Sequence, residues 1–217
     1  MTHGYDLMLK GHNGIAFEVP MMDEELLFRL LFIAIYVVFF GVRMRYRVES
    51  ARRTPEERRE AGGKAYRLLI IAVLGYIVSI VLYMLAIPWT SWSQIVVPSW
   101  LRWLGVVGAT SSVLLVAWIH RTLGRQYSAE LAIQKDHALV TSVPYASIRH
   151  PMYTALNMFS FSLALTTSNL LVLFFAVLVI VPFPWIARNE EKMLLETFGE
   201  EYREYMRRTG RFFPRIR

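Results

Sequence analysis

The chain has 217 residues, 55% of them hydrophobic, with a formal net charge of +7 and no cysteine. This length suits one domain, and the lack of cysteine excludes disulfides and thiolate metal sites. The apolar residues are gathered in long runs with few charges inside them, which excludes an ordinary soluble helical protein. No basic–aromatic motif typical of nucleic-acid binding occurs, so the positive charge needs another explanation.

Four apolar runs follow one another along the chain. Three of them, Leu26–Val42, Leu68–Ile87 and Trp100–Ile119, approach the roughly 20 residues that a helix needs to cross a bilayer. The fourth, Tyr153–Ile186, is long enough for a helical hairpin, and the Thr-Thr-Ser-Asn stretch at 166–169 is its natural turn. We therefore predict a single, all-α integral membrane domain with five transmembrane helices, the last two forming a hairpin.

Basic residues fill only alternate loops. They crowd the loop between the first two runs, the segment after the third run and the tail after the hairpin, whereas residues 88–99 and the hairpin turn carry no charge. Residues 1–25 are net acidic and lack the basic start and apolar stretch of a secretory signal. Because basic loops stay cytoplasmic, we expect residues 1–25 outside the membrane and the C-terminus inside, near anionic lipid headgroups.

A last helix is expected after the hairpin. Apolar side chains recur at near-helical spacing from Leu194 to Tyr205, charged side chains such as Glu200 and Arg203 take the other side, and Pro214 closes the segment. This pattern predicts an amphipathic cytoplasmic helix that lies on the membrane surface or against the other helices.

Two polar clusters flank the hairpin on its predicted cytoplasmic side. The first consists of His137, Tyr145, Arg149, His150 and Tyr153, and the second of Arg188, Glu190 and Glu191. A hairpin brings its two ends together, so the clusters should face each other at the membrane–water boundary and form a pocket for a ligand with polar and charged parts.

Each residue of these clusters also has a structural interpretation when taken alone. Arg149 suits a snorkelling cation that sets topology, and His150 suits a residue that starts a helix. The two glutamates suit a solvated first helical turn, favoured by the helix dipole.

The two clusters lie in stretches that resemble a known family. The sequence HALVTSVPYASIRHPMYTA at 137–155, followed after the hairpin by EEKMLLETFGEEYREYMRRTGRFFP at 190–214, resembles the membrane-embedded isoprenylcysteine carboxyl methyltransferases. That family is similar in turn to the phospholipid N-methyltransferases. The resemblance covers residues 134–214 and implies a methyltransferase core over 126–217, preceded by three membrane helices over 26–125.

The resemblance implies S-adenosylmethionine as methyl donor, bound at the cytoplasmic face. The residues it assigns to the cofactor are Gln134, His137, Ala138, Leu139, Val140, Tyr145, His150, Pro151, Met152, Tyr153 and Glu190. The chain departs from the family pattern at Val143 and Ala155, where the family has glycine. It departs again at Ile186, where the family often has a substrate-binding arginine.

The implied reaction is carboxyl O-methylation of a lipophilic, isoprenylcysteine-like substrate that enters from the bilayer. The candidate catalytic residues are Arg149 and Arg188, which could orient the carboxylate, and His150. One alternative is N-methylation of a lipid amine, with His150 as the base; another is a non-catalytic membrane protein that binds lipids or a partner. No histidine constellation indicates a metal site.

Overall fold

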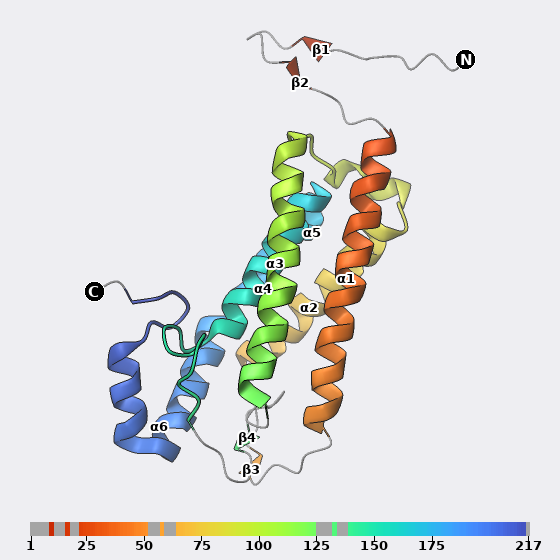
Figure 1. Cartoon of the computed structure of the whole chain (residues 1–217). Coiled ribbons are helices and arrows are strands. Elements are labelled where there is room, and N and C mark those ends of the chain that lie inside the picture. The colour runs from red at the N-terminus through yellow and green to blue at the C-terminus, as the bar shows by residue number, and fades with distance from the viewer. Residues whose placement is uncertain are drawn as a thin grey trace.

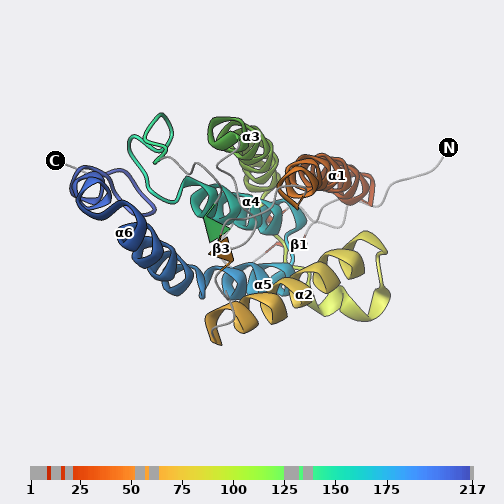
Figure 2. The same ribbon diagram turned by 90° about the horizontal axis from the view of Figure 1, so that it is seen from below.

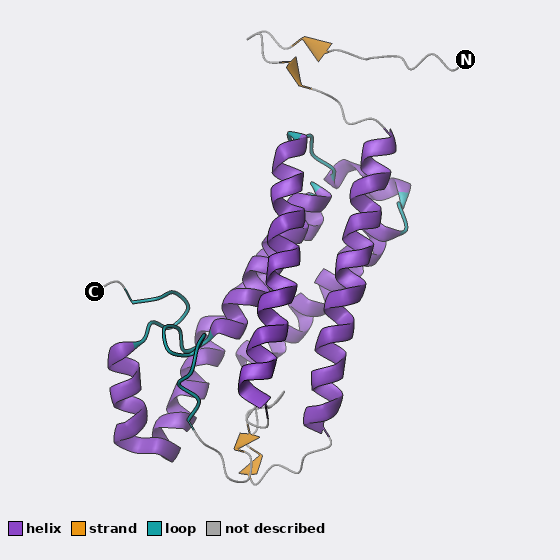
Figure 3. Cartoon of the chain, in the orientation of Figure 1, coloured by secondary structure: helices purple, strands orange, loops and turns teal. Residues whose placement is uncertain are grey.

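The computed structural model describes residues 9–10, 16–17, 22–51, 57–58, 64–124, 132–133 and 139–215. Within these residues the chain is helical almost throughout, as predicted (Figure 3). The helices are α1 (Met22–Ala51), α2 (Lys64–Met84), η1 (Pro88–Ser93, a 3-10 helix), α3 (Ser99–Leu123), α4 (Pro151–Thr167), α5 (Leu170–Ile180) and α6 (Phe183–Arg208). Two-residue strands form two antiparallel ladders, β1 (Leu9–Lys10) with β2 (Ala16–Phe17) and β3 (Glu57–Arg58) with β4 (Ala132–Ile133).

Helix α4 lies at the centre of the bundle. It packs against α3, α1 and α5, and α2 packs against α5 on the far side. Figure 2 shows the resulting order, with α1 and α3 on one side of α4 and α2 and α5 on the other. Helix α6 leaves the bundle at the end where α4 begins, and then bends back on itself (Figure 1).

Among the described residues, four segments are long and apolar enough to cross a membrane: Glu24–Glu49, Lys64–Met84, Ser99–Leu123 and Leu170–Arg208. Their outward faces carry large apolar side chains; Val37, Ile71 and Leu114, for example, are 62%, 66% and 68% exposed. Outward apolar faces on long helices suit a lipid environment, where they meet hydrocarbon rather than water. The chain is therefore a multi-pass membrane protein. Helix α4 has only 17 residues, and the count of five spans stays a prediction.

The hairpin turn lies within the predicted stretch at 166–169. Helix α4 ends at Thr167, Ser168 adopts a left-handed conformation with φ of 49°, and α5 begins at Leu170. The side chain of Asn169 caps α5 by accepting hydrogen bonds from the amides of Leu171 and Val172, at 3.0 and 3.1 Å. Such a cap pairs two of the amide groups that a helix start leaves without partners, which matters most away from water.

The second arm of the hairpin is shorter than predicted. The sequence analysis extended it to Ile186, but α5 ends at Ile180 and α6 begins at Phe183. Pro182 separates them, because a proline lacks the amide hydrogen that would continue the α5 ladder. Ile186 consequently lies on α6, where it is buried in the main hydrophobic core.

The amphipathic C-terminal helix is also broken. Gly199 interrupts α6 with φ of 57° and ψ of −123°, a conformation that glycine adopts at little cost. The helix ends at Arg208 rather than at Pro214. The bend turns the last helical stretch back toward the start of α4 (Figure 1).

An ion pair between a buried arginine and a half-buried glutamate joins the helices at the end of the bundle farthest from α6. Arg102 on α3 is 2% exposed, contacts Glu25 on α1 at 2.8 Å and donates to the carbonyl of Thr166 on α4 at 3.0 Å. Glu25 also accepts from the Tyr83 hydroxyl on α2 at 3.0 Å. A single carboxylate and a single guanidinium thus connect four helices, and each compensates the other's burial.

Helices α3 and α4 approach each other closely at Gly105. A Cβ atom added there would lie 2.6 Å from the amide nitrogen of Thr166 and 2.7 Å from the carbonyl oxygen of Ser162. Both obstructing atoms belong to the backbone, so they cannot move without moving α4. Small residues allow this kind of backbone contact between membrane helices.

We expect Gly105→Ala to destabilise the protein, because the new methyl group would force α3 and α4 apart. Overpacking of this kind costs about 1–3 kcal/mol, which corresponds to about 2–4 °C in melting temperature per kcal/mol for a chain of this size. Thermal unfolding in detergent measures the change. The matched control is Gly41→Ala on α1, where nothing lies within 4 Å of the added atom. Equal melting temperatures for the two variants would contradict the close contact.

Candidate functional site

The residues before α4 are held by the residues after α6. The amide of Arg149 donates to the carbonyl of Gly210 at 2.9 Å, and the amide of His150 donates to the carbonyl of Arg211 at 3.0 Å. In return, the amide of Gly210 donates to Ser147 at 3.0 Å. This short parallel pairing brings together two segments that are about sixty positions apart in the chain.

The carboxylate of Glu191 joins these two segments through their arginines. Its side chain is 4% exposed and accepts from the Arg149 Nε at 2.9 Å. Arg211 binds the same carboxylate with two nitrogens, at 3.1 and 2.5 Å. Two guanidinium groups thus compensate one buried carboxylate, and the geometry to Arg211 is the bidentate one that makes such pairs strong.

Arg149 also caps the C-terminal end of α6. Its Nη1 donates to the carbonyl of Met206 at 3.1 Å, and it contacts both the carbonyl and the hydroxyl of Thr209. The hydroxyl of Tyr205 donates to the carbonyl of Tyr145 at 2.7 Å, which ties the same end of α6 to the loop before α4. A cation at a helix C-terminus satisfies carbonyl groups left without intrahelical partners and interacts favourably with the helix dipole.

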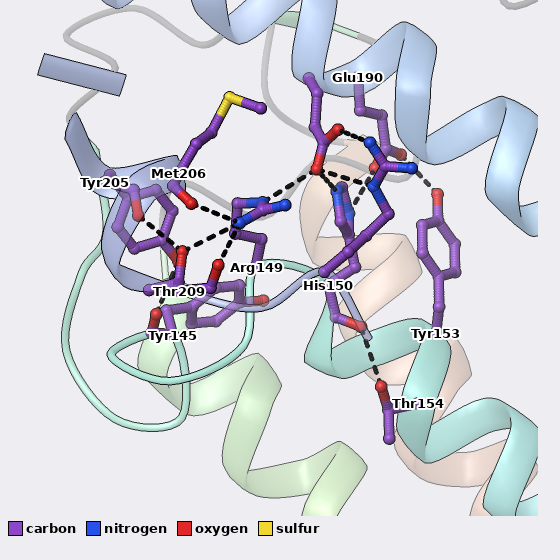
Figure 4. Close-up of polar contacts among 11 residues, drawn as sticks. Tyr145, Arg149, His150, Tyr153, Thr154, Glu190, Tyr205, Met206 and Thr209 are labelled. Atoms are coloured by element: carbon purple, nitrogen blue, oxygen red, sulfur yellow. Dashed lines mark hydrogen bonds and ion pairs between the residues drawn. The ribbon is translucent and has the colours of Figure 1, made fainter. Parts of the chain in front are cut away.

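The neighbouring carboxylate, Glu190, has a different environment. It is 29% exposed, lies 3.2 Å from the Nδ1 of His150, and accepts from the Tyr153 hydroxyl at 2.5 Å. The ring of Tyr153 stacks on Phe183, with centroids 4.7 Å apart. His150, Tyr153 and Glu190 thus form a small polar group with one partly exposed carboxylate (Figure 4).

The pKa of His150 is raised above its ordinary value of 6.5. Burial by itself lowers this pKa, but the hydrogen bond and negative charge of Glu190 and the negative charge of Glu191 outweigh it. The Nε2 of His150 lies 3.4 Å from the Glu191 carboxylate, close enough for charge attraction. However, it has no hydrogen-bond partner among the described residues. The imidazole is therefore held in its charged form to a higher pH than a free histidine.

The structure brings together most of the predicted site residues. Tyr145, Arg149, His150, Tyr153 and Glu190 converge, and Pro151 is the first residue of α4. Leu139 and Val140 are half-buried in the preceding loop, and Met152 contacts Arg43. Gln134, His137 and Ala138 lie outside the described residues. Arg188 is exposed on α6, and among the described residues no ion pair joins it to this group.

The sequence analysis missed two cations near the site. Arg211 was counted only as part of a basic tail, and Arg43 only as part of a basic loop. A run of arginines after a membrane helix is the ordinary topology signal, so nothing in the sequence distinguished these two. Their partners come from segments that are distant along the chain.

Comparison with known proteins supports the family resemblance. A family model described as phospholipid methyltransferase matches residues 100–201. Two curated relatives are the cobalt-zinc-cadmium resistance protein CzcN of Cupriavidus metallidurans, 32% identical, and the nickel-cobalt-cadmium resistance protein NccN of Alcaligenes xylosoxydans xylosoxydans, 29% identical. Each alignment covers 67% of this chain, and the chain spans 64% and 65% of the lengths of these relatives.

A solved structure has the same fold. It is that of a eukaryotic intramembrane Ras methyltransferase, an isoprenylcysteine carboxyl methyltransferase, with a TM-score of 0.51 and 20% sequence identity. The match covers 88% of this chain and 71% of that one. Together with the family model, it confirms the resemblance noted in the sequence: the chain is similar to membrane-embedded methyltransferases over residues 100–201 and in its fold.

We expect the contribution of His150 to stability to depend on pH. Because its folded pKa is raised above 6.5, the stabilisation is fully present below that pH and is lost as pH rises through the folded pKa. The melting temperature of the wild type relative to His150→Gln should therefore fall between pH 6 and pH 9, by about 2–4 °C for each kcal/mol lost. Thermal unfolding in detergent at several pH values measures it. A difference that stays constant or grows with pH would contradict the raised pKa.

Proposed function

We propose that the protein is an S-adenosylmethionine-dependent methyltransferase that O-methylates the carboxylate of a lipophilic, isoprenylcysteine-like acceptor. The observation that carries the proposal is the contact of the Arg-His-Pro segment with Glu190 across the hairpin. His150 and Tyr153, at the start of α4, meet Glu190 on α6 within 3.2 and 2.5 Å. This is the pairing that the family resemblance requires of a cofactor site.

The chemistry of these residues fits the cofactor. Glu190 is accessible, and its two oxygens retain free lone pairs beside the donors that they already accept. Those lone pairs suit an amino group or ribose hydroxyls. The faces of Tyr145 and Tyr153 suit a positively charged sulfonium, and the buried Nε2 of His150 offers a position for a hydrogen-bond partner. Leu139 and Val140 would line the adjoining loop, with Gln134, His137 and Ala138 proposed from the resemblance alone.

The proposed reaction requires little acid–base catalysis from the protein. A C-terminal carboxyl group has a pKa near ~3.5 and is ionised at neutral pH. When bound, S-adenosylmethionine would supply a methyl group whose bond to sulfur breaks with its electron pair left on sulfur, while a carboxylate lone pair forms the new C–O bond. The residues of the site would have to align the two groups and exclude water from the carboxylate.

Methylation of a lipid amine is the second candidate, and the description of the matching family model favours it. An ammonium group must lose a proton before it can attack, and His150 is the available base. However, Glu190 and Glu191 raise the pKa of His150, so it keeps its proton to a higher pH than an ordinary histidine and is available as a base over a narrower range of pH. This environment supports a carboxylate acceptor.

We further propose that the site faces the cytoplasm. The end of the bundle that carries it also carries the basic loop between α1 and α2 and the basic stretch of α6. The curated relatives are named for metal resistance, and we do not propose that role for this chain. Among the described residues, no group of three or more His, Asp or Glu could hold a metal ion.

Substitution of Glu190 tests the cofactor assignment. Glu190→Gln should weaken binding of S-adenosylhomocysteine by roughly 10- to 100-fold, as expected when a hydrogen bond to a charged group is lost. Isothermal titration calorimetry in detergent measures Kd. The matched control, Glu200→Gln, alters a carboxylate that is 65% exposed and pairs with Arg203 on the outer face of α6. Equal Kd values for both variants would remove Glu190 from the cofactor site, and no binding to the wild type would favour a non-catalytic membrane protein.

The acceptor class and the sidedness can be tested together. Sealed inverted membrane vesicles are given cofactor with a radioactive methyl group, together with a prenylcysteine or a phospholipid amine. We expect label on the prenylcysteine that alkali releases, as it releases a methyl ester. Right-side-out vesicles should give none, because the charged cofactor does not cross lipid. Alkali-stable label confined to the amine would reject the carboxylate acceptor but keep the methyltransferase.

A further inference from the structure

The cation that would bind the acceptor carboxylate is not among the residues predicted for it. The Arg149 side chain is 9% exposed and already paired with Glu191 and the end of α6. Arg188 is exposed on the outside of α6. Ile186, at the position where the family often has an arginine, is 8% exposed and packs in the core. A carboxylate in this site therefore needs a cation from another helix.

Arg43, near the end of α1, is such a cation. Its Nη1 lies 3.3 Å from the Nε2 of His120 on α3 and 3.7 Å from the sulfur of Met152 on α4. His120 is fully buried and stacks on Tyr46, with ring centroids 4.3 Å apart. Within the described part of the chain, no carboxylate forms an ion pair with Arg43. Its guanidinium is thus positioned by a histidine and a thioether, neither of which neutralises its charge.

The surroundings of Arg43 are mostly apolar. The preceding residue, Val42, and Phe39 one turn earlier pack with Tyr145 and Met152 in a hydrophobic cluster between α1, α3 and α4. A half-buried cation beside such a cluster loses hydration without gaining an anion, which is costly. An incoming carboxylate would supply the missing charge.

Arg43 also lies next to the proposed cofactor residues. Met152, which it contacts, directly precedes Tyr153, whose hydroxyl donates to Glu190. Glu190 therefore borders the site on the α6 side, and Arg43 borders it on the α1 side. The outward face of α1 exposes Val37 and Val38, so an apolar tail lying along α1 in the bilayer would bring its polar head to Arg43.

We propose that Arg43 binds the carboxylate of the lipophilic acceptor, with His120 holding its guanidinium in place. This inference rests on the proposed function and names the part of the site that selects the acceptor. A cation at this point attracts a carboxylate and repels an ammonium, so it would also discriminate against lipid amines. The methionine carboxylate of the cofactor has the same chemistry as the acceptor, and the experiment separates the two.

The test compares Arg43→Gln with Arg47→Gln, an exposed arginine one turn later on α1. Methyl transfer to a prenylcysteine gives KM, and calorimetry with S-adenosylhomocysteine gives Kd. We expect Arg43→Gln to raise the acceptor KM by roughly 10- to 100-fold and to leave the cofactor Kd within about twofold, since Arg43 would contact only the acceptor. Arg47→Gln should change neither. A non-reactive prenylcysteine analogue should inhibit the wild type more strongly as its carboxylate than as its carboxamide, and this preference should vanish in Arg43→Gln.

Arg43→Lys covers the case in which Arg43→Gln does not fold. It keeps the charge but not the planar fork of donors, and an intermediate KM is expected. An unchanged KM in both folded variants would overturn the assignment while methyl transfer by the wild type keeps the proposed function. A weakened cofactor Kd with unchanged KM would assign Arg43 to the cofactor instead. No transfer by the wild type to prenylcysteine would overturn the proposed function and this inference with it.

Discussion

The half of the molecule that contains α6 and the start of α4 depends on the buried carboxylate of Glu191. A carboxylate withdrawn from water is stable only when cations and donors replace its hydration. Here the replacement comes from Arg149, just before α4, and from Arg211, after α6. Because both must reach the same carboxylate, the entry to α4 and the chain after α6 cannot move independently. The bend at Gly199 and the parallel pairing at Gly210 make the second contact possible.

The two adjacent glutamates, Glu190 and Glu191, differ in their surroundings and in what each can bind. Successive residues on a helix point about 100° apart, since a turn has 3.6 residues. Glu191 accordingly points toward the arginines, and 4% of its side chain is exposed. Glu190 contacts His150 and Tyr153, and 29% of its side chain is exposed. The fully paired carboxylate holds the frame, and the accessible one retains capacity for a ligand. A single glutamate could not serve both purposes, because full pairing would consume its lone pairs.

The same frame can serve acceptors of opposite charge. Relatives of this fold include proteins named for phospholipids and for isoprenylcysteine, and methyl transfer from a sulfonium places few demands on the protein beyond alignment. What distinguishes acceptors is the charge that lines the site. In this chain, the two glutamates raise the pKa of His150, and Arg43 lies near the end of α1. Both features support the proposal of an anionic acceptor, which the fold alone cannot choose.

The sequence by itself determined that the chain has membrane-spanning helices and where some of its helices start or turn. The signals that determined them are local: apolar runs, alternating basic loops, the turn at 166–169 and the proline at the start of α4. Each of these signals depends only on neighbouring residues in the sequence. Glu190 and the Arg-His-Pro segment were recognised as a pair because their order and spacing form a motif.

Only the tertiary structure decided the partners of the arginines. In the sequence, Arg43, Arg149, Arg188 and Arg211 look alike, as basic residues next to membrane helices. Their roles diverge because of where α6 bends and how closely α4 lies to α1 and α3. Arg149 and Arg211 pair with Glu191, Arg188 is exposed, and Arg43 contacts His120 and Met152. Ion pairing depends on distance and desolvation rather than on sequence position, and both were settled by contacts between segments far apart in the chain.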